Sequence, residues 1–201
     1  MPNSFSTLKA SAEHLPEIVN IHCESLPNDF LPGLGKDFLL DVFYPAVYRS
    51  KEAQLTVDLD VKGQVNGFII TTRESDKFLT QIIKQDLISF ITIGIKSSFK
   101  SFKSLQNNIA IVFSGLFSPE TTKAGEIYII AVDKNLRGKG VGKRLVAAAE
   151  NYLLNAGISA IKIKTLASNT SWIQHFEKEN WNRVGDLTLI GKKYVVLMRK
   201  L

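Results

Sequence analysis

A glycine-rich stretch, residues 137–142, has the residue types and spacing best suited to chemistry in this sequence. It reads Arg-Gly-Lys-Gly-Val-Gly and follows the apolar run 126–132. Glycines let the backbone approach a ligand closely, and unpaired N–H groups at the start of the next helix attract a negative group. Lys139, Lys143 and Arg144 add positive charge beside the same turn. The stretch is therefore predicted to hold a pyrophosphate.

Two common phosphate-binding motifs do not fit this stretch. A P-loop needs a glycine five residues before its Gly-Lys pair and a hydroxyl after it, and the chain has Arg137 and Arg144 at those positions. A dinucleotide fingerprint needs a glycine where Lys143 stands and an acidic residue about twenty positions later. No Asp or Glu occurs between Asn151 and Thr170. The spacing therefore excludes a P-loop, and it fits a dinucleotide fingerprint poorly.

The elements around this stretch form a predicted β-α-β unit. A buried-type strand is expected at 126–132, a helix at 141–156 that ends at Gly157, and a second strand at 158–166. The pattern then predicts a helix capped by Asn169 and ended near Asn180, followed by closing strands at 181–184 and 186–199, with a turn at Gly191-Lys192 in the second of these.

The N-terminal half predicts helices and a hairpin. Apolar periodicity favours helices at 11–23 and 37–48, separated by a Pro- and Gly-rich loop, and alternation favours a hairpin of strands at 54–61 and 65–72. We read 75–117 as an insertion or substrate-side helical region, whose apolar part at 78–95 is an amphipathic helix interrupted by charges. The whole chain, 1–201, is expected to be a single domain.

Two sequence motifs in the C-terminal part resemble motifs of the GCN5-related N-acetyltransferase family. The Arg/Gln-x-x-Gly-x-Gly/Ala signature of this family is matched by Arg137, Gly140 and Gly142. The stretch 169–181 is similar to the family's downstream motif, Asn-x-x-Ala-x-x-x-Tyr-x-x-x-Gly-Phe. The resemblance implies an α/β fold with a mixed, mostly antiparallel central sheet, flanked by helices and splayed at the cofactor strand. It covers the residues from Glu126 onward.

The resemblance also implies a cosubstrate, acetyl-CoA, and a way to hold it. The backbone of Ile130, Ala131 and Val132 would pair with pantetheine as an added strand does. Asn169 would contact the cofactor arm. Backbone N–H groups would hold the pyrophosphate, and these belong to Arg137, Gly138, Lys139, Gly140, Val141 and Gly142.

The implied reaction is direct attack of a neutral primary amine on the thioester, within a ternary complex. Glu126 is the expected base, against the alternative of a strand-end carboxylate in solvent. Phe176 stands where many members have an acidic Tyr, so His175, Tyr128 or water must protonate the thiolate, or it leaves unaided. The same Phe supports an alternative function, an acyl-CoA-binding module or sensor without turnover.

Composition sets the remaining expectations. The net charge of +6 is scattered, which disfavours nucleic acid and suits a small acidic acceptor amine, with a protein N-terminus or lysine as second choice. A single cysteine and a polar N-terminus predict a cytoplasmic protein, without a membrane span or a metal. A homodimer is possible through an apolar face on 78–95. The loop around Asp29 is expected to shape acceptor choice.

Overall fold

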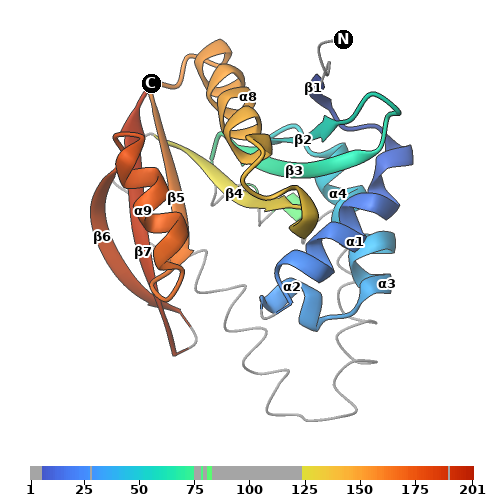
Figure 1. Ribbon diagram of the computed structural model, residues 1–201, viewed down its shortest axis with the longest axis horizontal. Coiled ribbons are helices and arrows are strands. Elements are labelled where there is room, and N and C mark those ends of the chain that lie inside the picture. Colours follow the sequence, from blue (N-terminus) through green and yellow to red (C-terminus); the bar gives the residue numbers. More distant parts are fainter. Residues whose placement is uncertain (1–5, 28, 75–77, 79–80, 83–123, 190) are drawn as a thin grey trace.

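A seven-stranded sheet runs through the computed structural model, which describes residues 6–27, 29–74, 78, 81–82, 124–189 and 191–201 (Figure 1). The strand order is β1-β2-β3-β4-β5-β7-β6. Their bounds are β1 (Ser6–Lys9), β2 (Ala53–Leu59), β3 (Val65–Thr72), β4 (Gly125–Val132), β5 (Ala160–Leu166), β6 (Asn182–Leu189) and β7 (Lys192–Lys200). Neighbours are antiparallel except β4 and β5, which are parallel. The predicted mixed, mostly antiparallel sheet is confirmed.

Helices cover both faces of this sheet (Figure 1). One face carries α1 (Leu15–Ser25), α2 (Phe30–Gly33), α3 (Lys36–Phe38) and α4 (Tyr44–Arg49), and the other carries α8 (Val141–Asn155) and α9 (Thr170–Lys178). Each layer has its own core. The first core gathers Ile18, Phe43, Tyr44, Val57 and Phe68, and the second gathers Ile69, Leu145, Leu153, Phe176 and Leu197.

The N-terminal half follows its sequence pattern with three differences. Strand β1 was not predicted, because its four residues are all exposed and show no alternation. The predicted loop after α1 contains the short helix α2. The predicted helix 37–48 is interrupted by a π-helical turn at Leu39–Phe43, just before Pro45, a residue that has no N–H to donate.

The predicted hairpin of β2 and β3 is confirmed, and its turn is fixed by one side chain. A carboxylate oxygen of Asp60 accepts hydrogen bonds from the N–H groups of Lys62 and Gln64 at 2.8 and 2.9 Å. Apart from residues 78, 81 and 82, the predicted 75–117 region and its amphipathic helix lie outside the described residues. Phe78 and Ile82 are buried in the first core.

In the C-terminal half, the β-α-β unit of β4, α8 and β5 is confirmed. Gly157 and Asn180 have φ angles of 74° and 63°, as expected where helices end. The predicted break between the closing strands at Gly185 is wrong, because β6 runs through Gly185, where the ladder only shifts register. The predicted turn at Gly191-Lys192 is confirmed, since β7 begins after Gly191, which has a φ angle of 70°.

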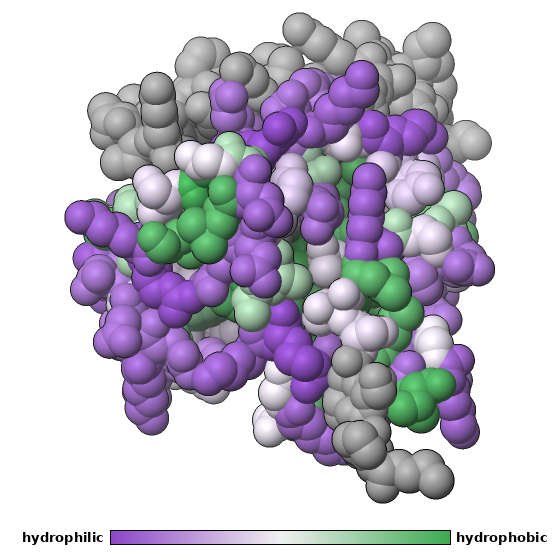
Figure 2. Space-filling view, turned by 90° about the horizontal axis from the view of Figure 1, so that it is seen from above, coloured by the Kyte–Doolittle hydropathy of each residue, from purple (hydrophilic) through white to green (hydrophobic). Residues whose placement is uncertain are grey.

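The surface seen from above is mostly hydrophilic, with separate small hydrophobic patches (Figure 2). Large hydrophobic side chains that are exposed include Leu8, Tyr48, Val61, Leu154 and Val184. Within the described ranges, no helix has the length and apolar character needed to cross a membrane.

Candidate active site

The parallel strands β4 and β5 start side by side and then separate (Figure 1). Their pairing covers Gly125, Glu126 and Ile127 of β4, and no strand in the described part of the chain pairs with that edge further along. On the β3 side, Tyr128 is the extra residue of a bulge, because Ile70 pairs with Ile129 while Thr71 pairs with Ile127. We call the β5-facing backbone of residues 128–132 the open edge of β4.

Backbone groups of Ile130 and Val132 point to the open edge. The N–H of Asp133 donates to the carbonyl of Asn66 on the β3 side at 2.9 Å. Because successive residues of a strand direct these groups to opposite edges, Ala131 faces β3, whereas Ile130 and Val132 face away from it. Two of the three residues predicted to pair with pantetheine therefore offer groups to an added extended chain.

The glycine-rich loop connects the end of β4 to α8. Asp133 accepts a hydrogen bond from the N–H of Asn135 at 2.7 Å and starts the 3-10 turn η3 (Lys134–Leu136). Gly138 and Gly140 follow with φ angles of 75° and 80°, which L side chains rarely adopt. A Cβ on Gly138 would meet no atom within 4 Å, so glycine is needed there for conformation and not for space.

The start of α8 leaves donors unused. The N–H of Arg144 bonds to the carbonyl of Gly140 at 3.1 Å, which is the first such bond of the helix. The N–H groups of Val141, Gly142 and Lys143 therefore have no carbonyl acceptor within α8. Unpaired N–H groups at the positive end of a helix dipole favour a negatively charged group at this point.

The cations near this loop have different surroundings. Lys143 pairs with Glu179 at 3.3 Å, and both side chains are exposed. Lys139 is exposed and has no ion pair among the described residues. The guanidinium of Arg144 bonds to Asp58, a fully buried residue of β2, so its charge faces the sheet.

Helix α9 borders the loop through Trp172. A Cβ on Gly142 would lie 3.4 Å from the Trp172 ring, which is ordinary contact, so this position has room for alanine. Trp172 stacks on the buried Phe176 with ring centroids 5.2 Å apart. Asn169 precedes α9 as predicted, but its side chain makes no cap bond; its Nδ2 lies 3.5 Å from the Thr165 hydroxyl.

Glu126 is a buried, ion-paired residue where β4 and β5 separate. Its side chain is 4% exposed, and one carboxylate oxygen lies 3.5 Å from the ammonium groups of both Lys162 and Lys164. The alternative of a solvated strand-end carboxylate is therefore wrong. Buried charges require such partners, and these three side chains share the sheet face that carries α1.

The groups considered as acid occupy different places. His175 is exposed on α9, and the centroid of its ring lies 5.8 Å from that of Trp172. Tyr128 packs against Phe78 at 5.0 Å, and burial together with the charge of Glu126 raises the pKa of its phenol well above the ordinary range. Tyr128 is therefore a protonated group near Glu126 at neutral pH.

The loop after α1 lies within electrostatic range of β7. Burial raises the pKa of Asp29, and the positive charge of Lys192 opposes that rise. Burial raises the pKa of Tyr194, and the charge of Asp29 raises it further. Because β7 lies beyond β5 in the sheet, this loop reaches toward strands on the far side of the open edge.

Two residues of this region were not found from the sequence. Asp58 holds Arg144, and Ser25, the last residue of α1, donates its hydroxyl hydrogen to the Val132 carbonyl at 2.9 Å. Both lie far from their partners in the chain, and no local pattern marks them. Among the described residues, His, Cys, Asp and Glu form no group of three or more suited to a metal ion.

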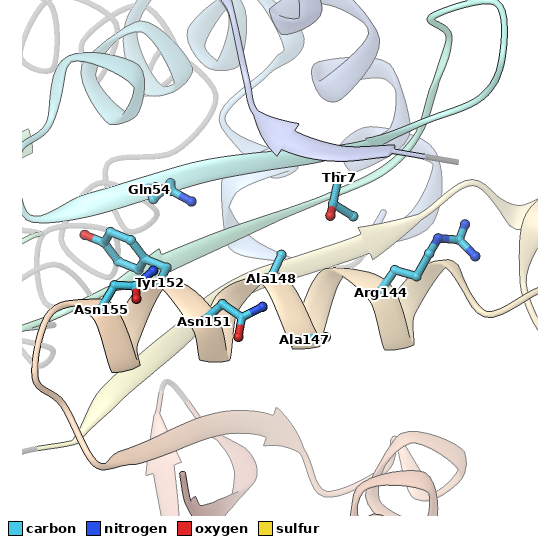
Figure 3. A pocket seen from close by; sticks show the side chains of 8 residues that line it. All are labelled: Thr7, Gln54, Arg144, Ala147, Ala148, Asn151, Tyr152 and Asn155. Carbon is cyan, nitrogen blue, oxygen red and sulfur yellow. The ribbon is translucent and has the colours of Figure 1, made fainter. Parts of the chain in front are cut away.

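A surface groove of about 650 Å³ lies elsewhere, between α8 and the edge formed by β1 and β2 (Figure 3). It is lined by Thr7, Gln54, Arg144, Ala147, Ala148, Asn151, Tyr152 and Asn155. Figure 3 shows it on the side of α8 away from β5. The groove does not include the open edge of β4.

Comparison with known proteins adds a family and a fold. A model of the acetyltransferase (GNAT) family matches residues 17–180. A curated relative, the mycothiol acetyltransferase of Arthrobacter sp. (strain FB24), is 30% identical over 69 residues, which is 34% of this chain and 21% of that protein. The matched stretch thus spans about a fifth of that relative's length.

Solved structures resemble the chain along nearly its whole length. The ribosomal-protein-S18-alanine N-acetyltransferase of Escherichia coli superposes with a TM-score of 0.60 and 13% identity, covering 98% of this chain and 94% of that one. An N-acetyltransferase of Staphylococcus aureus Mu50 superposes with a TM-score of 0.62 and 16% identity, covering 98% of both chains. At such low identity the likeness concerns the fold.

Proposed function

Because the chain belongs to the acetyltransferase (GNAT) family, we propose that it transfers the acetyl group of acetyl-CoA to a primary amine of a small molecule. The observation that carries this proposal is the open edge of β4 leading directly into the glycine-rich loop. In the ternary complex the amine nitrogen bonds to the carbonyl carbon, the C–S bond breaks, and the sulfur leaves with the electron pair as a thiolate.

The residues present fit acetyl-CoA. The backbone groups of Ile130 and Val132 suit the amides of pantetheine, and the unused N–H groups at the start of α8 suit the pyrophosphate. Within the predicted range 137–142, the N–H of Lys139 instead donates to the Leu136 carbonyl at 3.3 Å. A side chain at Gly138 or Gly140 would be strained at the observed positive φ. Asn169 would contact the cofactor arm from the start of α9.

Glu126 is the base in this proposal. It lies on the α1 face, where the strands separate, and Lys162 and Lys164 balance its charge. It would take the amine proton directly or through one water. No residue is assigned as the acid, because Phe176 is buried and has no proton to give. A thiol with a pKa of about 8.5 is a tolerable leaving group without an acid.

The charges near the reaction centre favour a small acceptor that carries an acidic group. The chain carries a net charge of +6, and the ammonium groups of Lys162 and Lys164 lie beside Glu126, which disfavours the approach of a basic peptide tail. A protein N-terminus or lysine remains the second choice. We treat a binding module without turnover as the alternative supported by Phe176.

Calorimetric titration with acetyl-CoA tests the binding step. We expect the intact protein to bind, the double variant Gly140→Glu with Gly142→Glu to lose binding while folded, and Gly142→Ala to keep it, since that site has room for a methyl group. Absence of binding by the intact protein would overturn the proposal. Release of free CoA with a panel of small amines, compared with peptides, then separates an enzyme from a binding module.

A further inference from the structure

The last residue of α1, Ser25, contacts the part of β4 that meets the cofactor in the proposed function. Its hydroxyl donates to the Val132 carbonyl at 2.9 Å. This carbonyl belongs to the open edge, because the neighbouring Asp133 N–H faces β3. Ser25 therefore occupies an acceptor that a bound pantetheine would otherwise meet.

The peptide group between Val132 and Asp133 is held at both ends. Ser25 donates to its carbonyl, and its N–H donates to the Asn66 carbonyl at 2.9 Å. The side chain of Asn66 is itself bonded to the buried Asp58 at 2.9 Å. The two hydrogen bonds on opposite sides of the Val132–Asp133 peptide group fix its plane, and each strengthens the other.

The end of α1 has further contacts with the segment that follows β4. A guanidinium nitrogen of Arg137 lies 3.4 Å from the Ser25 carbonyl, where a cation complements the helix C-terminus. Lys134 pairs with Glu24 at 3.3 Å, although both side chains are exposed. Hydroxyl, carbonyl and ion-pair contacts thus bind one helix end to the strand end and to the loop.

From this geometry we propose that Ser25 is a positioning residue for acetyl-CoA. Its hydroxyl fixes the orientation of the Val132 peptide group and occupies the Val132 carbonyl by a hydrogen bond, so that Val132 presents only its N–H to the cofactor. Ile130 then supplies the carbonyl that an extended amide needs. The same contact links the cofactor strand to the loop after α1, which holds Asp29. The inference rests on the proposed function.

Two variants of Ser25 separate the hydroxyl from the backbone. Ser25→Ala removes the donor but keeps the carbonyl that Arg137 contacts, and Ser25→Thr keeps both. We expect Ser25→Ala to bind acetyl-CoA about fivefold more weakly, with a matching rise in its KM and kcat within about twofold. Ser25→Thr is expected to bind within about twofold of the wild type.

The outcomes distinguish the two proposals. If the wild-type protein does not bind acetyl-CoA in the titration, both fail. If it binds and Ser25→Ala binds equally well or more tightly, the positioning role is overturned and the proposed function stands. If Ser25→Thr loses as much affinity as Ser25→Ala, with thermal unfolding equally lowered in both, the effect is structural and the inference again falls.

Discussion

Arg144 holds the buried carboxylate of Asp58 through two hydrogen bonds, from Nε at 2.6 Å and from Nη2 at 2.9 Å. Asp58 is fully buried on β2 and also accepts from the Asn66 amide at 2.9 Å. The hydrogen bond to Asp58 raises the pKa of Arg144, so the guanidinium stays protonated at all ordinary pH values. The first turn of α8 is thereby tied to the sheet beneath it.

Breaking this pair should destabilise the fold. Arg144→Gln leaves the Asp58 carboxylate buried without its cation, and we expect the free energy of unfolding in urea to fall by about 3 kcal/mol. Arg183 provides the matched control, because its pair with Asp186 is exposed. Arg183→Gln should cost less than about 1 kcal/mol. Equal losses in the two variants would contradict a structural role specific to Arg144.

Changing Glu126 tests its role as base. Glu126→Gln keeps the shape but cannot take a proton, so kcat should fall by about 100-fold or more while acetyl-CoA affinity is retained. The variant also removes a counterion of the ammonium groups of Lys162 and Lys164, which should lower the stability.

A double variant separates these two effects. Glu126→Gln combined with Lys164→Gln removes one positive charge along with the carboxylate, and should regain part of the lost stability in urea unfolding. If Glu126 is the base, kcat stays low in the double variant. Recovery of kcat along with stability would show that Glu126 serves only charge balance.

Asp29 should affect the acceptor and not the cofactor. The charge of Asp29 raises the pKa of Tyr194, and the charge of Lys192 acts to lower the pKa of Asp29. Tyr194 and Lys192 both belong to β7, which lies on the far side of the open edge. In Asp29→Asn we expect the KM for the amine to change about fivefold or more, because a charged hydrogen-bond partner is lost, while the acetyl-CoA Kd is unchanged. An unchanged ranking of amine substrates would remove this loop from acceptor selection.

The pH dependence of stability should report on His22. Its Nδ1 lies 2.7 Å from the Tyr44 hydroxyl, and its Nε2 is buried without a partner among the described residues. Burial lowers the pKa of His22 from 6.5 to about 4. Between these values the unfolded chain binds a proton that the folded protein does not, so stability is lost as pH falls from 6.5 to 4.

The measurement is urea unfolding of the wild type and of His22→Leu between pH 7 and pH 4. The His22 contribution should amount to about 3 kcal/mol over this window, and its removal should flatten the profile by that amount. Differences between the two proteins cancel the contribution of carboxylates common to both. Parallel profiles would show that His22 does not titrate as its burial requires.

Much of the fold could be predicted from local sequence patterns. Alternation in 54–61 and 65–72 was enough for the hairpin, and Gly157 and Asn180 were enough for two helix ends, because these features depend on neighbours in the chain. The exposed strand β1 was missed, since its place is set by pairing with β2. The π-helical turn was also missed, although Pro45 stands just after it in the sequence.

The glycine-rich loop, the β-α-β unit around it and the family could be predicted from the sequence, because turn geometry and helix starts are local properties. The folded structure was needed to show that Arg144 faces Asp58, that Glu126 lies between two lysines, and that Ser25 contacts Val132. The Ser25 contact joins residues 107 positions apart. Such pairings depend on how strands and helices pack, and no local pattern of residues records them.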